Sequence, residues 1–454
     1  MSKDTRTLFG TDGVRGLANR HPMTAELAMK LGRAVGYRLR QTTGRRPKVL
    51  IGKDTRLSGY MMETALVSGL CSVGADSHLV GPLPTPGIAF LTSGMRADAG
   101  LVISASHNPF EDNGIKIFGR DGYKLPDADE LLLERLLDSE EVDHYRPVGT
   151  EIGRAYRIED AAGRYSVFAK AVFPKELTLE GLRVVVDCAN GAGYRVAPEV
   201  LRELGAEVIS MGVSPDGTNI NHDCGALYPE NMVRMVRERR ADVGVALDGD
   251  ADRCILTDAR GQLVDGDQVL ALLGRFLLSR GQLAKSTLVA TVMSNIGLDR
   301  AIKDAGGRVV RVDVGDRYVV ERMRADGLNV GGEQSGHIVL LDHTTTGDGL
   351  VTALTVLGIM VQSGQPLSEL AACMTRYPQV LLNIDVPEKP PIESLSGLQE
   401  TIAGVESELG DEGRVLVRYS GTQMKCRVMV EGPDDAVIED AARRLVSALR
   451  GDLA

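Results

Sequence analysis

The sequence predicts an α/β protein made of three related α/β domains with mixed, largely parallel sheets, followed by a smaller C-terminal α+β domain. The length of 454 residues corresponds to about three domains of ordinary size. One pattern occurs three times: an apolar run, a loop, a helical stretch, a glycine and a second apolar run. After Tyr377 this pattern changes, which predicts a last domain of a different kind.

The three repeats have the hydrophobic pattern of βαβ units. They are predicted over residues 48–81, 183–212 and 287–315. Their helices are expected to end at Gly74, Gly205 and Gly306, because glycine readily adopts the left-handed conformation that ends many helices. The repeats are about a hundred residues or more apart, which is too far for a solenoid and indicates separate domains.

The chain after Tyr377 is expected to form a small α+β domain. The pattern predicts a strand over 380–386, a helix over 398–408, two strands around Val415 and Val428, and a last helix after Pro433-Asp434-Asp435. An earlier apolar stretch, 350–361, is too short to span a bilayer and is expected to be a buried helix. The predicted domain limits are 1–155, 156–256, 257–374 and 375–454.

The composition excludes several classes of protein. With 43% hydrophobic and 25% charged residues, the chain is neither disordered nor fibrous. Its 52 Lys and Arg against 62 Asp and Glu give a formal net charge of -10, which argues against binding nucleic acid or an anionic membrane. The start of the chain lacks a secretory signal, and six scattered cysteines fit neither a disulfide framework nor a zinc site. We therefore expect a cytoplasmic protein.

The segment ADVGVALDGDADRCILTD places Asp248, Asp250 and Asp252 at every second position after an apolar strand. Three converging carboxylates need a counter-ion, and oxygen ligands suit a hard cation such as Mg²⁺. An EF-hand is excluded because Arg253 and Ala259 stand where its glycine and glutamate are required. The remaining alternative is an acidic surface turn.

The segment LVISASHNPFEDNGIKIFG predicts a strand that ends at Ser104 and Ser106, with a turn forced by His107, Asn108 and Pro109. A serine at such a strand end projects into the crevice where α/β proteins bind ligands. It is therefore a candidate acceptor for a phosphate bound beside the metal. The alternative is a serine that serves only as a turn or helix cap.

The segment VLVRYSGTQMKCRVMVEG has the parts of a phosphate-binding loop, namely guanidinium groups, hydroxyls and glycine backbone N–H groups. These groups belong to Arg418, Ser420, Gly421, Thr422 and Arg427. An ordinary hairpin turn is the alternative.

Two other glycine-rich loops carry candidate binding residues. NVGGEQSGHIVLL contains Glu333, Ser335 and His337, which suit a ligand rich in hydroxyl groups. FGTDGVRG contains Arg15. A plain glycine turn and a solvated surface arginine are the respective alternatives.

In chain order, the serine loop, the aspartate loop, Gly-Glu-Gln-Ser-Gly-His and Arg-Tyr-Ser-Gly-Thr resemble the motifs of the α-D-phosphohexomutase family. The resemblance covers nearly the whole chain and implies four domains around a central cleft. FGTDGVRG and GGEQSGH are most similar to family members that act on amino sugars. The implied reaction is the interconversion of glucosamine 6-phosphate and glucosamine 1-phosphate, on the route to UDP-N-acetylglucosamine and peptidoglycan precursors.

The resemblance also implies how the phosphoryl group is carried. Ser106 would be a phosphoserine that donates its phosphoryl group to the sugar, giving glucosamine 1,6-bisphosphate, which turns around and returns the other phosphoryl group. Asp248, Asp250 and Asp252, together with Ser106, would hold Mg²⁺.

The remaining motif residues receive supporting roles by the same resemblance. Arg15, Lys116 and Arg253 would add positive charge, and Glu333 and Ser335 would bind sugar hydroxyls. The phosphate that is not reacting would be bound by Arg418, Ser420, Gly421, Thr422 and Arg427. Arginine stays charged, so Lys116 and His337 are the candidates for general acid and base, and the sequence does not rank them.

Other functions remain open from the sequence. The same machinery could act on mannose or glucose phosphates, or the chain could be a non-catalytic homologue that binds sugar phosphates. The last loop reads Gln423-Met424 where the family commonly has Glu-Pro, so its shape is in doubt. The resemblance implies a homodimer, and because the serine and the phosphate loop lie on different domains, we expect the last domain to close over the cleft.

Overall fold

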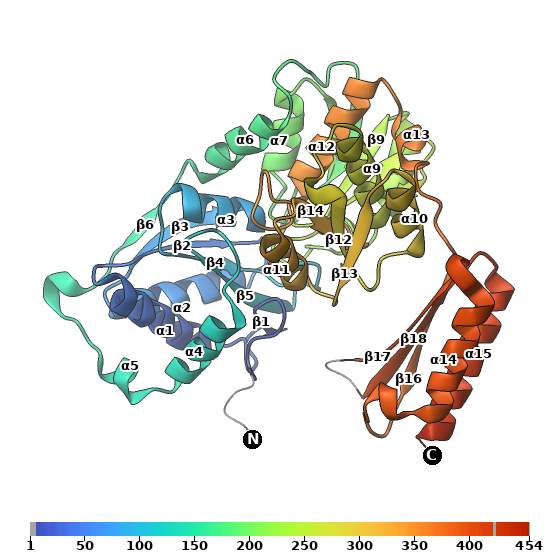
Figure 1. The fold of residues 1–454 in the computed structure, drawn as a ribbon. Helices are drawn as coiled ribbons and strands as arrows, with labels where there is room; N and C mark the ends of the chain where they lie inside the picture. Colours follow the sequence, from blue (N-terminus) through green and yellow to red (C-terminus); the bar gives the residue numbers. More distant parts are fainter. Residues whose placement is uncertain (1–5, 421–423, 454) are drawn as a thin grey trace.

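The computed structural model describes residues 6–420 and 424–453, and its four sheets follow one another along the chain (Figure 1). The first sheet has the order β1-β5-β4-β2-β3-β6. Its strands are β1 (Val14–Leu17), β2 (Lys48–Lys53), β3 (Asp76–Pro82), β4 (Ala99–Ile103), β5 (Asp112–Gly119) and β6 (Ala155–Arg157). Its helices are α1 (Ala25–Thr43), α2 (Gly59–Ser72), α3 (Thr85–Gly94), α4 (Asp127–Leu137) and α5 (Glu140–His144). Strands β2, β3, β4 and β6 pair in parallel, and β5 is antiparallel to β4 and β1.

The second and third sheets are also mixed. The second has the order β11-β10-β9-β7-β8, with β7 (Arg183–Asp187), β8 (Glu207–Met211), β9 (Val243–Leu247), β10 (Cys254–Asp258) and β11 (Leu263–Val264). Its helices are α6 (Ala161–Val172), α7 (Val196–Glu203) and α8 (Glu230–Arg239). The third has the order β13-β12-β14-β15, with β12 (Thr287–Thr291), β13 (Arg308–Val312), β14 (Val330–Gly332) and β15 (Ile338–Leu340). Its helices are α9 (Gly266–Ser279), α10 (Ile296–Asp304), α11 (Asp316–Asp326), α12 (Gly349–Ser363) and α13 (Leu367–Ala371).

The last sheet is antiparallel throughout, with the order β16-β18-β17. Its strands are β16 (Gln379–Asp385), β17 (Arg414–Tyr419) and β18 (Lys425–Glu431), and its helices are α14 (Ser396–Leu409) and α15 (Asp435–Asp452). Short 3₁₀ turns occupy Gly149–Glu151, Ala284–Ser286, Ile392–Ser394 and Gly410–Glu412. The predicted fold class, three mixed α/β domains and an α+β domain, is confirmed.

The residues that end the repeats behave as predicted. Gly74, Gly205 and Gly306 have φ values of +77°, +101° and +85°, the region that glycine adopts without steric cost. Asp434 caps α15 by accepting hydrogen bonds from two backbone N–H groups. The apolar stretch 350–361 lies within the largely buried helix α12. No helix in the described ranges has both the length and the apolar character that a bilayer span requires.

The apolar cores show which domains are packed together. One apolar core runs through the first three domains and includes Leu50, Tyr165, Val186 and Leu288. A second core packs α1 and α2 on the opposite face of the first sheet. The last domain has its own core, and it lies apart from the first domain in Figure 1. The first three domains therefore form one packed body to which the fourth is attached.

The fourth domain is attached to the third by buried polar contacts. Arg414 on β17 donates to the carbonyl oxygens of Val292 (3.0 Å) and Ser294 (2.9 Å), and it pairs with Glu431 at 2.8 Å. Asn295 donates to the carbonyl oxygen of Tyr377 at 2.9 Å and accepts from the Tyr377 N–H at 3.0 Å. These contacts hold the start of β17 against the third domain.

Candidate active site

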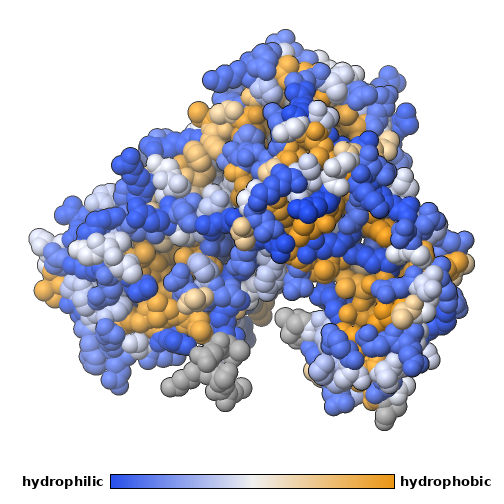
Figure 2. Space-filling model, viewed as in Figure 1, coloured by the Kyte–Doolittle hydropathy of each residue, from blue (hydrophilic) through white to orange (hydrophobic). Residues whose placement is uncertain are grey.

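A cavity of about 390 Å³ lies where the first three domains meet. Each of them contributes charged residues to its wall. Of the predicted site residues, the wall contains Arg15, Asp252, Arg253, Glu333 and His337. Figure 2 shows that the surface is hollowed between the first and the last domain. The central cleft implied by the resemblance is therefore present, and five predicted residues line its inner part.

Ser106 lies three residues after the end of β4, in a tight loop. It is buried, and its backbone has a φ of +52°, an uncommon conformation for a residue with a Cβ. Its backbone N–H donates to Ser104 Oγ at 2.9 Å, and its own Oγ donates to Asp248 Oδ2 at 2.6 Å. The loop thus directs the Ser106 hydroxyl at the aspartate cluster of the second domain.

The aspartate cluster follows β9 directly. Asp248, Asp250 and Asp252 are buried, and one oxygen from each lies within 4.8 Å of the others. In the described structure, Asp250 Oδ1 and Asp252 Oδ1 are buried and make no hydrogen bond, with His337 Nδ1 3.6 Å from Asp252 Oδ1. Unsatisfied carboxylate oxygens are costly to bury, so their convergence fits a bound hard cation. The residues present could therefore hold a divalent metal ion.

The electrostatics of the aspartate cluster favour the binding of a cation. Burial, together with Asp252 and Asp250, raises the pKa of Asp248 well above its usual value. Burial also raises the pKa of Asp252, but Lys116 and His337 outweigh it and hold that pKa well below the usual range. The hydroxyl of Thr85, at the start of α3, donates to Asp250 Oδ2 at 2.7 Å. The negative charge of Asp248 is thus destabilised, whereas Asp252 is kept charged.

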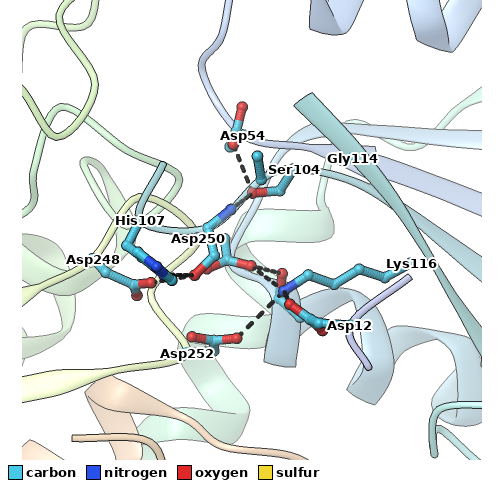
Figure 3. Close-up of polar contacts among 12 residues, drawn as sticks. Asp12, Asp54, Ser104, His107, Gly114, Lys116, Asp248, Asp250 and Asp252 are labelled. Carbon is cyan, nitrogen blue, oxygen red and sulfur yellow. Dashed lines mark hydrogen bonds and ion pairs between the residues drawn. The ribbon is translucent and has the colours of Figure 1, made fainter. Parts of the chain in front are cut away.

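Lys116 points from β5 into the carboxylate cluster (Figure 3). Its Nζ lies 2.8 Å from Asp250, 3.1 Å from Asp12 and 3.5 Å from Asp252. Burial lowers the pKa of Lys116, but Asp12 and Asp250 outweigh burial and raise it well above its usual value. Lys116 is therefore held as a buried cation. Arg15 pairs with Asp12 and donates to the carbonyl oxygen of Ala105 at 3.2 Å.

His337 lies between carboxylates of the second and third domains. Its Nδ1 is 3.6 Å from Asp252, and its Nε2 is 3.5 Å from Asp316 and accepts the Gly347 N–H at 3.1 Å. Burial lowers its pKa, but the carboxylates outweigh burial and raise it to about 9. The Gly347 N–H needs a lone pair on Nε2, which only the neutral ring has, so this contact opposes the charged form and places the proton of the neutral ring on Nδ1, facing Asp252.

The sugar-type loop faces the same cavity. Glu333 accepts hydrogen bonds from the Gly315 N–H at 3.0 Å and from Ser335 Oγ at 3.3 Å. Burial, with Arg253 and Arg15, lowers the pKa of His107, on the opposite wall, to about 4. Ser335 is exposed. This side of the cavity thus offers hydrogen-bonding groups to a bound ligand.

The phosphate-type loop lies on the fourth domain and does not line the described cavity wall. Arg418 and Arg427 face each other across β17 and β18. Burial and Arg427 lower the pKa of Arg418, while Asp313 of the third domain opposes them. Lys389 donates to the carbonyl oxygen of Ser420 at 2.6 Å. Gly421, Thr422 and Gln423 lie outside the described residues.

Several residues at the site were missed by reasoning from the sequence. Asp12 stands beside Arg15 in FGTDGVRG and could have been noticed as a carboxylate in that loop. Lys124 contacts Asp12 and lies 2.5 Å from Asp316, so it joins the first and third domains at the cavity wall. Asn221 donates to the carbonyl oxygen of Ser106 at 2.9 Å. Neither Lys124 nor Asn221 lies in a recognisable motif.

Comparison with known sequence families gives a match in every domain. Phosphoglucomutase/phosphomannomutase α/β/α domain I matches residues 6–143, domain II matches 165–261 and domain III matches 265–377. The C-terminal domain of the same family matches residues 381–448.

Full-length relatives are similar at high identity. The phosphoglucosamine mutase of Syntrophotalea carbinolica is 57% identical over 448 residues, covering 99% of this chain and 98% of the relative. That of Anaeromyxobacter dehalogenans is 59% identical over 456 residues, with the same coverages. That of Myxococcus xanthus is 58% identical over 445 residues, covering 98% of this chain and 97% of the relative.

Solved structures agree on the fold. A phosphoglucomutase/phosphomannomutase family protein from Burkholderia thailandensis superposes with a TM-score of 0.82 at 25% identity, covering 100% of this chain and 98% of the other. Aspergillus fumigatus N-acetylphosphoglucosamine mutase, solved with GlcNAc-6P and magnesium, has a TM-score of 0.67 at 20% identity and coverages of 100% and 97%. The second likeness supports the fold alone.

Proposed function

This chain belongs to the phosphoglucomutase/phosphomannomutase family, the α-D-phosphohexomutases, and we propose that it interconverts glucosamine 6-phosphate and glucosamine 1-phosphate as a phosphoglucosamine mutase. The observation that carries the chemistry is the Ser106 hydroxyl, 2.6 Å from Asp248 in the buried aspartate cluster. The observation that carries the substrate is the 57–59% identity over nearly the full length to phosphoglucosamine mutases.

Ser106 carries the phosphoryl group in this proposal. In the first transfer, the bond between Ser106 Oγ and phosphorus breaks, and a bond forms between phosphorus and the free hydroxyl oxygen of the sugar phosphate. The product is glucosamine 1,6-bisphosphate, and Ser106 regains its proton. The sugar then turns around, and its other phosphoryl group returns to Ser106. The mutase reaction therefore needs no net hydrolysis, and the bisphosphate also serves as the activator.

Asp248, Asp250 and Asp252 would hold Mg²⁺ together with an oxygen of the phosphorylated Ser106. When bound, the ion supplies positive charge that offsets the negative charge of the transferring group. The unpartnered oxygens of Asp250 and Asp252 support this assignment. Thr85 holds Asp250 in place from the first domain.

Proton transfer falls to Lys116 or His337. Lys116 is surrounded by carboxylates that keep it charged, so it can stabilise the transferred phosphoryl group, while the same carboxylates oppose the release of its proton. His337 presents an Nδ1 proton beside Asp252. Arg15 and Arg253 add fixed positive charge at the cavity wall. The two acid/base candidates thus contribute from the first and third domains.

Substrate binding is divided between the third and fourth domains. Glu333 and Ser335 bind sugar hydroxyls, and the phosphate that is not reacting is bound by Arg418, Ser420, Gly421, Thr422 and Arg427. Because the fourth domain has a separate core, it can close over the sugar phosphate as one unit. Closure would bring the phosphate loop to the cavity formed by the other domains.

The wider setting follows from the same proposal. The four functional units are residues 1–155, 156–256, 257–374 and 375–454, carrying the serine, metal, sugar and phosphate loops in turn. The enzyme works in the cytoplasm as a homodimer, and its product feeds UDP-N-acetylglucosamine synthesis.

The test compares sugar phosphates. With Ser106-phosphorylated protein, Mg²⁺ and a trace of the matching hexose bisphosphate, kcat/KM should be highest for glucosamine phosphate. A higher kcat/KM for mannose or glucose phosphate would assign the chain to the phosphomannomutase and phosphoglucomutase activities named for its domains. No turnover of any hexose phosphate would indicate a binding protein that keeps the fold.

A further inference from the structure

Arg56 is a completely buried arginine between β2 and α2. A guanidinium has five N–H donors in a rigid planar fork. Nη2 donates to the carbonyl oxygens of Ser106 and Asn108, both at 2.8 Å. Two donors of Arg56 therefore hold the backbone of the serine loop on either side of His107.

The remaining donors of Arg56 are also used. Nη1 donates to the carbonyl oxygen of Pro109 and, at 3.2 Å, to that of Asp112. Nε donates to Asp54 Oδ2 at 2.8 Å. All five donors are matched to acceptors, and four of the acceptors are carbonyl oxygens of residues 106–112. This segment is folded around the guanidinium.

The backbone N–H of Ser106 is held through the Arg56–Asp54 ion pair. Asp54 Oδ2 accepts a hydrogen bond from Ser104 Oγ at 2.6 Å, and Ser104 Oγ accepts the Ser106 N–H at 2.9 Å (Figure 3). The backbone N–H of Ser106 is thus held through Ser104, and its carbonyl oxygen is held by Arg56. Asn221 of the second domain adds a further donor to that carbonyl at 2.9 Å.

These contacts hold Ser106 in a backbone conformation that is unfavourable without them. A residue with a Cβ in the left-handed region costs roughly 1–2 kcal/mol, and Ser106 is held there with a φ of +52°. This conformation places Ser106 Oγ 2.6 Å from Asp248. If the carbonyl contacts were lost, the loop could relax and Oγ would turn away from the aspartate cluster.

We propose that Arg56 is a positioning residue for phosphoryl transfer: its fork holds the Ser106 backbone so that the side chain that carries the phosphoryl group stays aimed at the metal site. The inference rests on the proposed function. Arg56 lies outside the cavity wall, so it acts on transfer and leaves sugar binding unchanged. A displacement of about 1 Å at reacting atoms can cost roughly 100-fold in rate.

The experiment measures transfer from Ser106-phosphorylated protein to glucosamine 6-phosphate in a single turnover. It yields the maximal transfer rate and the sugar concentration at half-maximal rate. The variants are Arg56→Met and Arg56→Lys, the latter keeping the charge without the fork. The matched control is Arg33→Met. Arg33 is another buried arginine of the first domain, bound to Asp143 and to the carbonyl oxygen of Val142.

We expect both Arg56 variants to lose roughly 100-fold in maximal rate, with the half-saturating sugar concentration unchanged. Arg33→Met should lower the Tm and leave the transfer rate near that of the wild type. If neither Arg56 variant folds, Ser104→Ala gives the answer, since it removes the acceptor of the Ser106 N–H together with the link from that acceptor to Asp54, and it should cost roughly tenfold.

Three results would overturn the inference: wild-type rates in the folded variants, a change confined to sugar affinity, or equal rate losses in the Arg33 control. Transfer by the wild type to mannose or glucose phosphate instead would change only the proposed substrate, and the same comparison would be made on that sugar. A wild-type phosphoprotein that transfers to no hexose phosphate would overturn both proposals.

Discussion

Replacing Asp248 with asparagine tests the metal site through stability rather than activity. The candidate ligand oxygens lie within 4.8 Å of one another. Two negative charges at that separation repel by about 3.5 kcal/mol when the effective dielectric constant is about 20. Asp248 faces two such neighbours at or inside that distance, so its charge accounts for at least about 7 kcal/mol of repulsion before compensation by cations. Lys116, 2.8 Å from Asp250, offsets part of it.

Asparagine keeps an oxygen that can accept the Ser106 hydroxyl and removes one charge. In EDTA we therefore expect Asp248→Asn to have a higher Tm than the wild type, by about 1 °C for each kcal/mol of repulsion that remains. Added Mg²⁺ should raise the Tm of the wild type clearly and that of the variant much less, because a binding oxygen with full charge is gone.

Scanning calorimetry with EDTA and then with excess MgCl₂ measures both effects. Asp258→Asn is the matched control, because Asp258 is a buried aspartate of the same domain that only caps the turn at Arg260 and Gln262. This control should keep the full response to Mg²⁺. An equal Mg²⁺ response in wild type and Asp248→Asn would refute the assignment of the cluster as a metal site.

Three other outcomes are expected. Ser106→Ala should abolish mutase turnover in a steady-state assay, because the carrier of the phosphoryl group is removed; turnover at the wild-type rate would exclude the phosphoserine mechanism. Burial raises the pKa of Asp267 to about 7, so the wild type loses stability as pH rises from about 4 to about 7, where the unfolded chain has released this proton and the folded chain still holds it. Asp267→Asn should show a smaller fall in Tm over that range, and an equal fall would contradict this account. Arg414→Met should raise KM for the sugar phosphate and lower Tm, because it frees the fourth domain and leaves the buried Glu431 unpaired. A second change, Glu431→Gln, should restore Tm without restoring KM; an unchanged KM in Arg414→Met would exclude a role in placing the phosphate loop.

Local patterns in the sequence were enough to predict much of the fold. The βαβ units were predictable because buried strands are short apolar runs and because glycine ends each crossover helix in the left-handed region, as at Gly205. The limits between domains were harder to predict. β6 joins the first sheet although all three of its residues are exposed, so it has no apolar pattern. β10 and β11 extend the second sheet beyond residue 256, the end of the second domain that the sequence predicts.

The site was predictable where chemistry is concentrated in one segment. The spacing of Asp248, Asp250 and Asp252 predicts a cation site, with an acidic surface turn as the alternative. The structure brings the three carboxylates together and places Asp248 2.6 Å from the Ser106 hydroxyl. Arg56 and Lys124 could not be found in this way, because each is a single charged residue whose partners lie far along the chain. Their placement depends on strand order and domain packing, which a local pattern does not contain.

The most direct test of the central claim is the intact mass of the protein before and after it meets its sugar. Ser106-phosphorylated protein mixed with Mg²⁺ and excess glucosamine 6-phosphate should lose the mass of one phosphoryl group, and an equal amount of glucosamine 1,6-bisphosphate should form. Peptide mapping should place the lost group on Ser106. If the phosphoryl group stayed on the protein, or appeared only as inorganic phosphate, Ser106 would not be the carrier in a mutase reaction.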